Sequence, residues 1–329
     1  MSARLPLTLA CGDYEIVRAL RDGSVKPDGI ELTVLTEMDS NTRHNRFLKG
    51  REFDAAEVSS CAYITAKGQG LPFTALPVFL HRRFRHGFIF VNTSKGIRGP
   101  KDLIGRKVGL KSWQNSALTW LRGILEHEYG VAHRSIEWVC DLDEHVAFTP
   151  PAGLQLTRVR DDQSVEQMLA EGEIDALLHP DIIEPLLARD PRVGRLFPDY
   201  RAEQIRYFQS TGIFPIMHFL GLNPELVERH PWVPLNLQIA FDKAKAIAMK
   251  RIENPRRMPI VLAMEALEEQ QEIFGPDPWE YGLGARNRKN LETLVGYCHE
   301  QGLTPRRLTL DELFLNPSVG AKRDGVFRI

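Results

Sequence analysis

Hydrophobic and polar residues alternate along the first third of the chain in a way that is typical of strands and helices following one another. Residues 5–10, Leu-Pro-Leu-Thr-Leu-Ala, alternate like a half-buried strand, and a helical spacing of apolar residues follows the next turn. Strands are also predicted at 30–35 and 53–58, with helices near 41–49 and from Ser59. This order favours a parallel sheet that helices cover on both faces.

The same order of elements starts again in the middle of the chain. After strands at 73–79 and 87–91 and a short helix, a buried strand is predicted at 107–110 and a helix from about 112 to 129. Gly130 is the expected end of that helix, because glycine commonly follows the last helical turn. A second unit of strand, turn and helix is therefore predicted.

A short internal repeat indicates two similar lobes. Residues 47–55 and 168–176 share two apolar positions, a turn with Gly, then Glu, an apolar residue, Asp and Ala, and each copy is predicted to end a helix and start a buried strand. The lobes are expected to be discontinuous, with a hinge and a cleft where the chain crosses twice. The expected lobes are 1–92 plus 212–329 and 93–211.

The last third of the chain is predicted to be mostly helical. A return strand is expected at 211–222, followed by helices at 234–252, 258–274 and 288–301. Thr309 and Glu312 have the spacing of a capping box, which predicts a final short helix.

Composition narrows the function classes. The chain has 329 residues, with 42 Lys and Arg against 43 Asp and Glu, and this balance argues against a nucleic-acid partner. No apolar run approaches the roughly 18 residues of a membrane span, and residues 1–10 lack a signal-peptide core, so we expect a cytoplasmic protein without membrane contact. Cys11, Cys61, Cys140 and Cys298 are too scattered for a disulfide framework or a zinc knuckle and are expected to be reduced.

Several motifs resemble known proteins. Residues 96–109 are similar to the inter-lobe segment of type 2 periplasmic-binding-protein-like folds, and 169–176 resemble another recurring piece of them. More specific motifs resemble the 4,5-dihydroxyphthalate decarboxylase family over nearly the whole chain. These motifs lie at 10–14 (Ala-Cys-Gly-Asp-Tyr), 51–54 with Glu57, 84–86 (Phe-Arg-His), 120–125, 196–200, 211–218, 230–232, 287–288 and 299–303.

The resemblance implies an α/β, two-lobed binding-protein-like fold, with two mixed sheets flanked by helices and a hinge cleft, adapted to an enzyme. The implied reaction is that of a carboxy-lyase, which converts 4,5-dihydroxyphthalate to protocatechuate and carbon dioxide without an organic cofactor. The chain departs from the family pattern at Gly12, Glu15, Ile16, His44 and Asn45, where Trp, Asp, Arg and two aromatic residues are usual. These departures leave the exact aromatic substrate open.

Decarboxylating an arene needs a base, an acid and an anion clamp. Arg82 and Arg85 are the candidate clamp, because guanidinium pairs its donors with a carboxylate; a solvated basic turn is the alternative. His86 and His218, on the two expected crossing strands, are candidate catalytic proton shuttles, although a lone histidine is often structural. Glu57 ends a strand, where α/β sheets place ligands, and is either a third catalytic residue or a helix cap.

Substrate contacts are expected from both lobes. Asp13 and Tyr14 follow the first strand and are candidates to bond the substrate hydroxyls, unless they form an Asx turn. Gln114 and Ser116 lie where the long helix begins, whose unpaired amides attract an anion, so they are candidate donors to a carboxylate; alternatively, Asn115 and Ser116 only cap the helix. Arg46 matches a family position, although an arginine at a helix end is usually solvated.

No cofactor is assigned from the sequence. A divalent ion bound by His86, His218 and a carboxylate is left open. The expected partner is a small aromatic carboxylate, and apolar positions in the C-terminal helices suggest a homo-oligomer. Two alternatives stay open: a non-catalytic substrate-binding protein of a transporter, and a related lyase or pyrimidine-precursor enzyme on the same scaffold.

Overall fold

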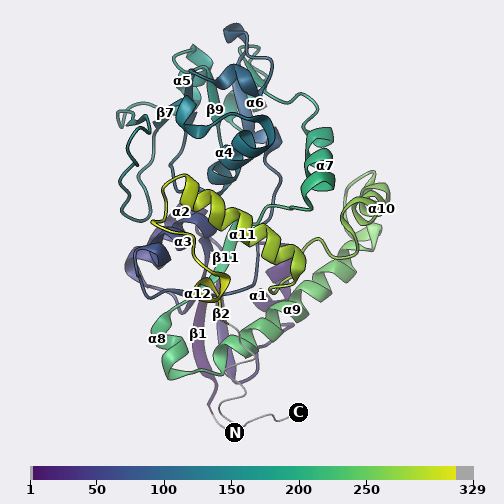
Figure 1. Ribbon diagram of the computed structural model, residues 1–329. Helices are drawn as coiled ribbons and strands as arrows, with labels where there is room; N and C mark the ends of the chain where they lie inside the picture. Colours follow the sequence, from purple (N-terminus) through teal and green to yellow (C-terminus); the bar gives the residue numbers. More distant parts are fainter. Residues whose placement is uncertain (1–2, 316–329) are drawn as a thin grey trace. The chain divides into compact units, whose positions relative to one another are not determined.

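The chain divides into two compact units in the computed structural model, which describes residues 3–315 (Figure 1). The first unit contains the described residues up to Arg82, then Ile216–Leu291 and the described residues from Leu308. The second unit contains Arg83–Pro215 and Glu292–Arg307.

The first unit is built on a mixed sheet with the strand order β2-β1-β3-β11-β4. Its strands are β1 (Leu5–Ala10), β2 (Ile30–Leu35), β3 (Ala55–Ser59), β4 (Thr74–Leu76) and β11 (His218–Leu222). The central β1 runs parallel to β2 and β3, whereas β11 runs antiparallel to β3 and β4. The sequence-based strands at 5–10 and 30–35 are confirmed.

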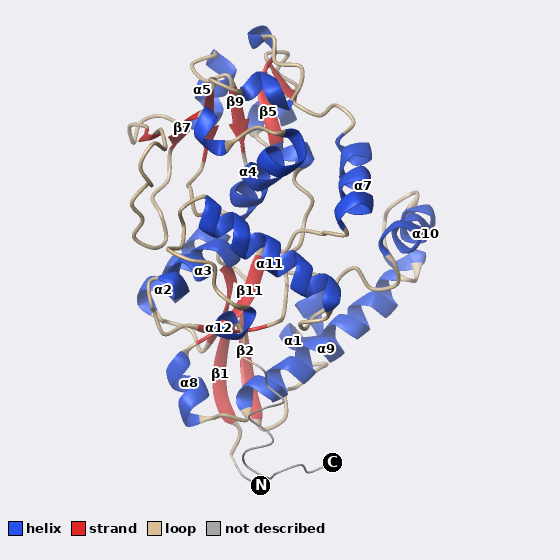
Figure 2. Cartoon of the chain, in the orientation of Figure 1, coloured by secondary structure: helices blue, strands red, loops and turns tan. Residues whose placement is uncertain are grey.

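Helices flank this sheet (Figure 2). They are α1 (Arg18–Arg21), α2 (Ser40–Gly50), α3 (Ser60–Gly68), α8 (Pro224–Arg229), α9 (Val233–Ile252) and α12 (Leu310–Leu313). The unit also contains α10 (Ala263–Phe274), which lies near one end of α9 and away from the strands, and the beginning of α11 (Ala285–Glu300). The long α9 contributes Leu237, Phe241 and Ala244 to the apolar core. The predicted capping box is confirmed at α12.

The second unit has its own mixed sheet, with the order β10-β5-β9-β6-β7-β8. The strands are β5 (Ile89–Asn92), β6 (Lys107–Leu110), β7 (Glu137–Cys140), β8 (Leu156–Arg158), β9 (Ala176–Leu178) and β10 (Val193–Arg195). Its helices are α4 (Ser116–Tyr129), α5 (Val165–Glu171), α6 (Glu184–Leu187) and α7 (Tyr200–Thr211). Both sheets are therefore mixed and helix-flanked, as the fold class predicts.

The internal repeat has the expected structural role in both units. The first copy ends α2 and leads into β3, and the second ends α5 at Gly172 and leads into β9. Gly172 has a φ of 78°, the left-handed conformation that favours glycine after a helix. The repeat thus marks equivalent helix-to-strand turns.

The unit boundaries differ from the expected ones. The chain enters the second unit at Arg83 rather than near residue 92, because β5 pairs with β9 and β10 of that unit. Residues 292–307 also belong to the second unit rather than the first. The reason is packing at the end of α11, where the Tyr297 ring contacts Trp120 and the Gln301 side chain accepts a hydrogen bond from Arg122.

The C-terminal helices of the first unit carry exposed apolar side chains around the start of α10. These are Ile260, Val261, Leu262 and Met264. The homo-oligomer suggested by the sequence stays a prediction. Within residues 3–315, none of the helices combines the length and apolar character that crossing a bilayer requires.

Candidate active site

Glu57 is the centre of a polar cluster inside the first unit. It lies in the middle of β3, between β1 and β11, and its side chain is fully buried. One carboxylate oxygen, Oε2, accepts hydrogen bonds from the Gly12 backbone N–H at 2.8 Å and from Arg43 Nη2 at 2.7 Å. The other, Oε1, accepts from the Tyr14 hydroxyl at 2.8 Å and faces His218 Nδ1 at 2.5 Å. Four donor groups therefore surround one carboxylate.

These donors keep Glu57 ionised. Burial alone raises the pKa of a carboxyl, but His218 first, and then Arg43, more than offset burial, so the pKa of Glu57 lies well below its usual value. Burial and the nearby Glu57 charge raise the pKa of the Tyr14 hydroxyl, which therefore stays protonated as a donor. The same two causes raise the pKa of the neighbouring Cys11 thiol to about 12.

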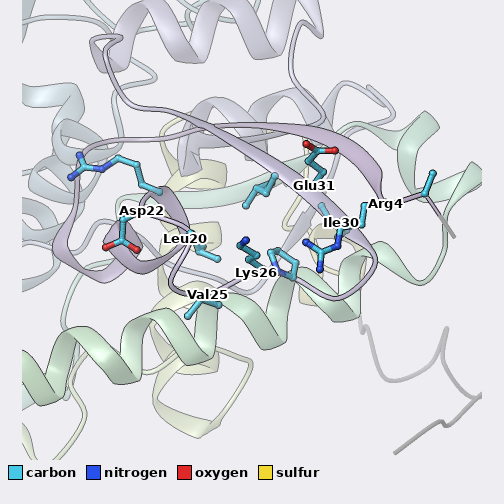
Figure 3. A pocket seen from close by; sticks show the side chains of 12 residues that line it. Arg4, Leu20, Asp22, Val25, Lys26, Ile30 and Glu31 are labelled. Carbon is cyan, nitrogen blue, oxygen red and sulfur yellow. The ribbon is translucent and has the colours of Figure 1, made fainter. Parts of the chain in front are cut away.

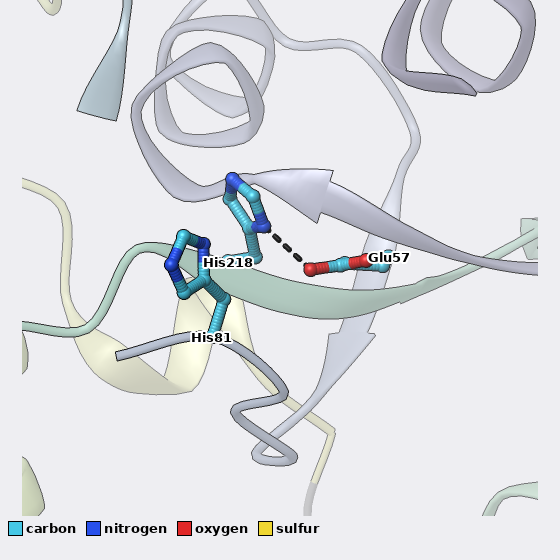
Figure 4. A group of neighbouring side chains, drawn as sticks. All are labelled: Glu57, His81 and His218. Atoms are coloured by element: carbon cyan, nitrogen blue, oxygen red, sulfur yellow. Dashed lines mark hydrogen bonds and ion pairs between the residues drawn. The ribbon is translucent and has the colours of Figure 1, made fainter. Parts of the chain in front are cut away.

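Three imidazoles, which we call the histidine cluster, lie together beside this carboxylate: His44, His81 and His218. The rings of His44 and His81 each lie 4.9 Å from the His218 ring, both in edge-to-face contact. Figure 4 shows His81 and His218 on neighbouring segments, with His218 directed to Glu57. The His218 side chain is 13% exposed, so the cluster is only partly closed to solvent.

Strand pairing brings the histidine cluster together. His218 begins β11 and pairs with Ser59 of β3, next to Glu57 along the sheet. The His81 carbonyl accepts the Met217 N–H at 2.9 Å, which holds residue 81 beside the start of β11. Because β11 arrives from far along the chain, only tertiary pairing makes these residues neighbours.

Helix α2 supplies Arg43, which pairs with Glu57, and His44, which contacts His218. Asp39 caps α2 by accepting the Thr42 N–H at 3.0 Å, and Phe47 anchors the helix on β11. A Cβ on Gly221 of β11 would lie 2.6 Å from the Phe47 ring, so glycine permits this close approach. Arg43 lies one turn before Phe47 on the same buried face and reaches Glu57 from there.

The cluster also has the composition of a metal site. Ligand atoms of Glu57, His81 and His218 all lie within 4.8 Å of one another. Two imidazoles and one carboxylate form a donor set that suits several divalent transition metals. The metal site left open in the sequence analysis instead combined His86, His218 and a carboxylate. His86 and His218 belong to different units.

The structure thus brings together three of the sequence-predicted residues: Glu57, His218 and Tyr14. Glu57 does not cap α3, since the Ser59 side chain does so. Tyr14 contacts the carboxylate rather than presenting a free hydroxyl. Asp13 points elsewhere, because its exposed side chain pairs with Arg21.

The predicted arginines already have other partners. Arg82 is buried in the first unit and donates to the Glu280 carbonyl at 2.7 Å and to Asn287 Oδ1 at 2.6 Å. Arg46 is partly exposed and pairs with Glu52 at 2.7 Å, the surface role weighed from sequence. In the second unit, Arg85 is buried and donates to the Pro180 carbonyl at 2.7 Å. Arg82 and Arg85 are therefore not part of a solvated basic turn. Each is buried and donates hydrogen bonds within its own unit.

His86 occupies an apolar site in the second unit rather than a polar one. Its ring lies 5.3 Å from Tyr207, 5.7 Å from Phe197 and 6.5 Å from Tyr129. Neither ring nitrogen has a hydrogen-bond partner among the described residues. Burial lowers the pKa of His86 to about 4, so the ring is neutral at pH 7. This environment is that of a packing residue, and the proton-shuttle role expected from the sequence stays a prediction.

The start of α4 is occupied by the chain's own groups. Asn115 caps the helix, and the Gln114 side chain bonds the backbone of Val146 through both its oxygen and its nitrogen. The backbone N–H groups of Trp113 and Gln114 donate to the Glu144 carboxylate at 2.6 and 2.9 Å. Ser116 is the buried first residue of α4. The backbone amides just before α4 thus hold the Glu144 carboxylate, and the substrate-binding roles of Gln114 and Ser116 stay predictions.

Sequence reasoning missed Arg43 and His81 as site residues and noted His44 only as a departure from the family pattern. The helical spacing of Arg43 and Phe47 was an available signal for a shared buried face. Nothing local marks His81, whose neighbour in the sheet is a residue near 217.

A separate pocket of about 580 Å³ lies elsewhere in the first unit (Figure 3). Arg4, Leu20, Lys26 and Glu31 are among its lining residues. It borders the beginnings of β1 and β2, whereas the Glu57 cluster lies toward the other end of these parallel strands. The pocket is therefore distinct from the candidate active site.

Comparison with known proteins identifies the family. Over 321 residues the chain is 32% identical to the 4,5-dihydroxyphthalate decarboxylase of Comamonas testosteroni, covering 95% of this chain and 97% of that protein. The chain belongs to the 4,5-dihydroxyphthalate decarboxylase family. A second family member, from Pseudomonas putida, is 29% identical over 203 residues, 60% of this chain and 78% of that protein. No protein-family model matches the chain.

Solved structures place this decarboxylase family chain in the periplasmic-binding-protein fold. The periplasmic aliphatic sulphonate binding protein SsuA of Escherichia coli aligns with a TM-score of 0.55 at 13% identity, covering 95% of this chain and 98% of that one. The alkanesulfonate-binding protein SsuA of Xanthomonas axonopodis pv. citri, bound to MOPS, aligns with a TM-score of 0.56 at 14% identity, covering 95% and 99%. At these identities the likeness concerns the fold alone, and it confirms the expected fold class.

Proposed function

We propose that this chain removes one carboxylate from a hydroxylated aromatic dicarboxylate, with 4,5-dihydroxyphthalate as the first candidate substrate and protocatechuate and carbon dioxide as products. The observation that carries the proposal is the 32% identity over 95% of the chain to a protein of that name. The ionised Glu57 and the histidine cluster beside it supply suitable chemistry.

The reaction requires a temporary place for the electrons of the broken carbon–carbon bond. Each carboxylate of 4,5-dihydroxyphthalate has a hydroxyl para to it. Loss of that hydroxyl proton increases electron density on the carbon that bears the carboxylate. This carbon takes up a proton, carbon dioxide leaves, and the ring regains its aromaticity, so one C–C bond is replaced by one C–H bond and one proton is consumed overall.

In this proposal the substrate hydroxyl lies against the histidine cluster. Glu57 contacts His218 Nδ1, so the second ring nitrogen, Nε2, is the atom that would hydrogen-bond the substrate oxygen. A ring N–H directed at the substrate oxygen stabilises the negative charge that develops on a phenolate. Imidazole also exchanges protons near neutral pH, as the reaction requires.

Three arginines are the candidates to bind the substrate carboxylates. Arg46, Arg82 and Arg85 each hold another group, so they would bind substrate only after exchanging those partners. Gln114 and Ser116 stay candidates on the second unit. We also propose a cytoplasmic location, since all four cysteines are buried thiols, which suits a reducing compartment.

The test is an assay of the purified chain with 4,5-dihydroxyphthalate, following protocatechuate by chromatography and carbon dioxide by a coupled assay. His218→Ala and Glu57→Gln are expected to lower kcat by about a hundredfold or more. His230→Ala, at a residue outside the cluster, is the matched control and keeps wild-type turnover. Absence of product with this substrate and with a panel of hydroxylated phthalates and benzoates refutes the proposal.

The alternative is a binding protein without turnover, with which the fold of the relatives is consistent. Both SsuA proteins are named for binding sulfonates. Calorimetric binding of 4,5-dihydroxyphthalate with no product over hours would favour this alternative over catalysis.

A further inference from the structure

Three side chains with metal-binding groups converge in the first unit from separate elements. Glu57 comes from β3, His218 begins β11, and His81 lies in the segment after β4. Their potential ligand atoms all lie within 4.8 Å of one another (Figure 4). Since an octahedral or tetrahedral ion with bonds of about 2.1 Å separates its ligands by roughly 3 to 4 Å, small side-chain rotations suffice to close the set.

The surroundings of Glu57 match those of a metal-binding carboxylate. Arg43 Nη2 and the Gly12 N–H hold Oε2, while Oε1 faces His218 and the Tyr14 hydroxyl. Metal-bound carboxylates are commonly oriented by such outer hydrogen bonds, and an oriented ligand loses little freedom when the ion binds. Oε1 is thus the oxygen placed to serve as a ligand.

Strand pairing holds two of the three ligand residues, and a backbone hydrogen bond ties the third to them. Glu57 and His218 lie on adjacent strands whose register pairs His218 with Ser59 and Leu220 with Glu57. The Met217 N–H donates to the His81 carbonyl at 2.9 Å, which ties the third ligand to the same strand. A site on paired strands holds its geometry more closely than a site on loops.

We propose that Glu57, His81 and His218 bind one divalent transition-metal ion, of which Zn²⁺ and Fe²⁺ are the expected kinds. His218 Nδ1 and Glu57 Oε1 lie 2.5 Å apart. The ion takes the place of this direct contact, because the imidazole nitrogen and the carboxylate oxygen then each bind the metal.

The ion would also define the substrate class of the site, an extension that rests on the proposed decarboxylation. Glu57 and Arg43 already balance each other's charge, so the positive charge of the ion calls for an anionic ligand. Two vicinal hydroxyl oxygens on a ring can fill two open positions of one ion. The ion lowers the pKa of a bound hydroxyl, which favours phenolate at neutral pH. The preferred substrates are therefore catechols rather than monohydroxylated rings.

The first experiment measures metal binding without catalysis. The purified full chain is stripped with a chelator, dialysed and titrated with Co²⁺, whose visible absorption bands report coordination, and then with Zn²⁺ in a calorimeter. One ion per chain is expected. His81→Ala and His218→Ala are expected to raise the dissociation constant by about a hundredfold or more, and His230→Ala leaves it unchanged.

A second measurement distinguishes loss of the metal site from misfolding of a variant. His81→Gln keeps a polar side chain of similar reach, and its thermal unfolding is compared with that of the wild type to establish folding. Adding protocatechuate to the Co²⁺ protein is expected to shift the visible bands, whereas 4-hydroxybenzoate leaves them in place. No binding at one ion per chain, or equal affinity in folded His81→Gln and wild type, overturns the metal site.

The outcomes separate this inference from the proposed function. If the stripped protein decarboxylates at an undiminished rate and binds no Co²⁺, the metal site is refuted while the function stands. If the ion binds stoichiometrically but no substrate of the panel is turned over, the function is refuted while the site stands.

Discussion

His86 provides a sharp test of the site assignment, because the sequence and the structure give it opposite roles. The sequence motif around Phe84 to His86 predicts a proton shuttle, whereas the structure packs the ring among Tyr129, Phe197 and Tyr207. The perturbation is His86→Phe, which keeps an aromatic ring and removes the titrating group. If packing is the role of His86, its loss changes the pH dependence of stability and spares turnover.

The magnitude follows from the pKa of His86. Burial lowers this pKa from 6.5 to about 4, so the folded chain binds the proton more weakly than the unfolded chain. Protonation therefore favours unfolding: the contribution of neutral His86 is complete above the unfolded pKa and is lost as the pH falls from about 6.5 toward 4. At 1.36 kcal/mol per pKa unit, the loss is about 2 kcal/mol at pH 5 and about 3 kcal/mol at pH 4.

The assay compares denaturant unfolding of the wild type and His86→Phe between pH 8 and pH 4.5. Other groups titrate in both proteins, so the informative quantity is the difference between the two unfolding free energies at each pH. That difference is expected to shift by about 2 kcal/mol in favour of the variant between pH 8 and pH 5, whatever constant offset the larger ring introduces. A flat difference, or a folded variant without decarboxylase activity, would refute the packing role and restore the proton shuttle.

Three further predictions concern buried contacts. Arg43→Ala leaves the Glu57 carboxylate buried without its cation, so the free energy of unfolding is expected to fall by about 3 to 5 kcal/mol. Adding Glu57→Gln is expected to restore part of that free energy, and a double-mutant cycle by denaturant unfolding checks both values. Gly123→Ala would place a Cβ 2.1 Å from the Tyr297 ring, and an unfolding free energy lower by about 1 to 3 kcal/mol is expected; an unchanged melting temperature would contradict this. Glu144→Gln removes the charge held by the amides before α4, so a dicarboxylate substrate is expected to bind with a lower KM and unchanged kcat; a raised KM would show that Glu144 supports binding instead.

The local pattern of the sequence determined most of the secondary structure. The buried strand at 107–110 and the long helix near 234–252 are found within a residue of their predicted ends, because each depends on its own apolar spacing. The capping box at Thr309 and Glu312 is likewise a local contact. The long helix of the second unit instead starts at Ser116 rather than near 112, since Asn115 takes the capping position.

Of the site, the sequence by itself determined Glu57, Tyr14 and His218, each marked by a strand end or by a family motif. Only the tertiary structure decided that Arg43, His44 and His81 join them, and that aromatic rings surround His86. The physical reason is that β11 pairs antiparallel with β3, so that residues distant in sequence share one buried charge. Whether a histidine titrates or packs depends on the groups around it, and those are set by strand pairing rather than by the residues next to it in the chain.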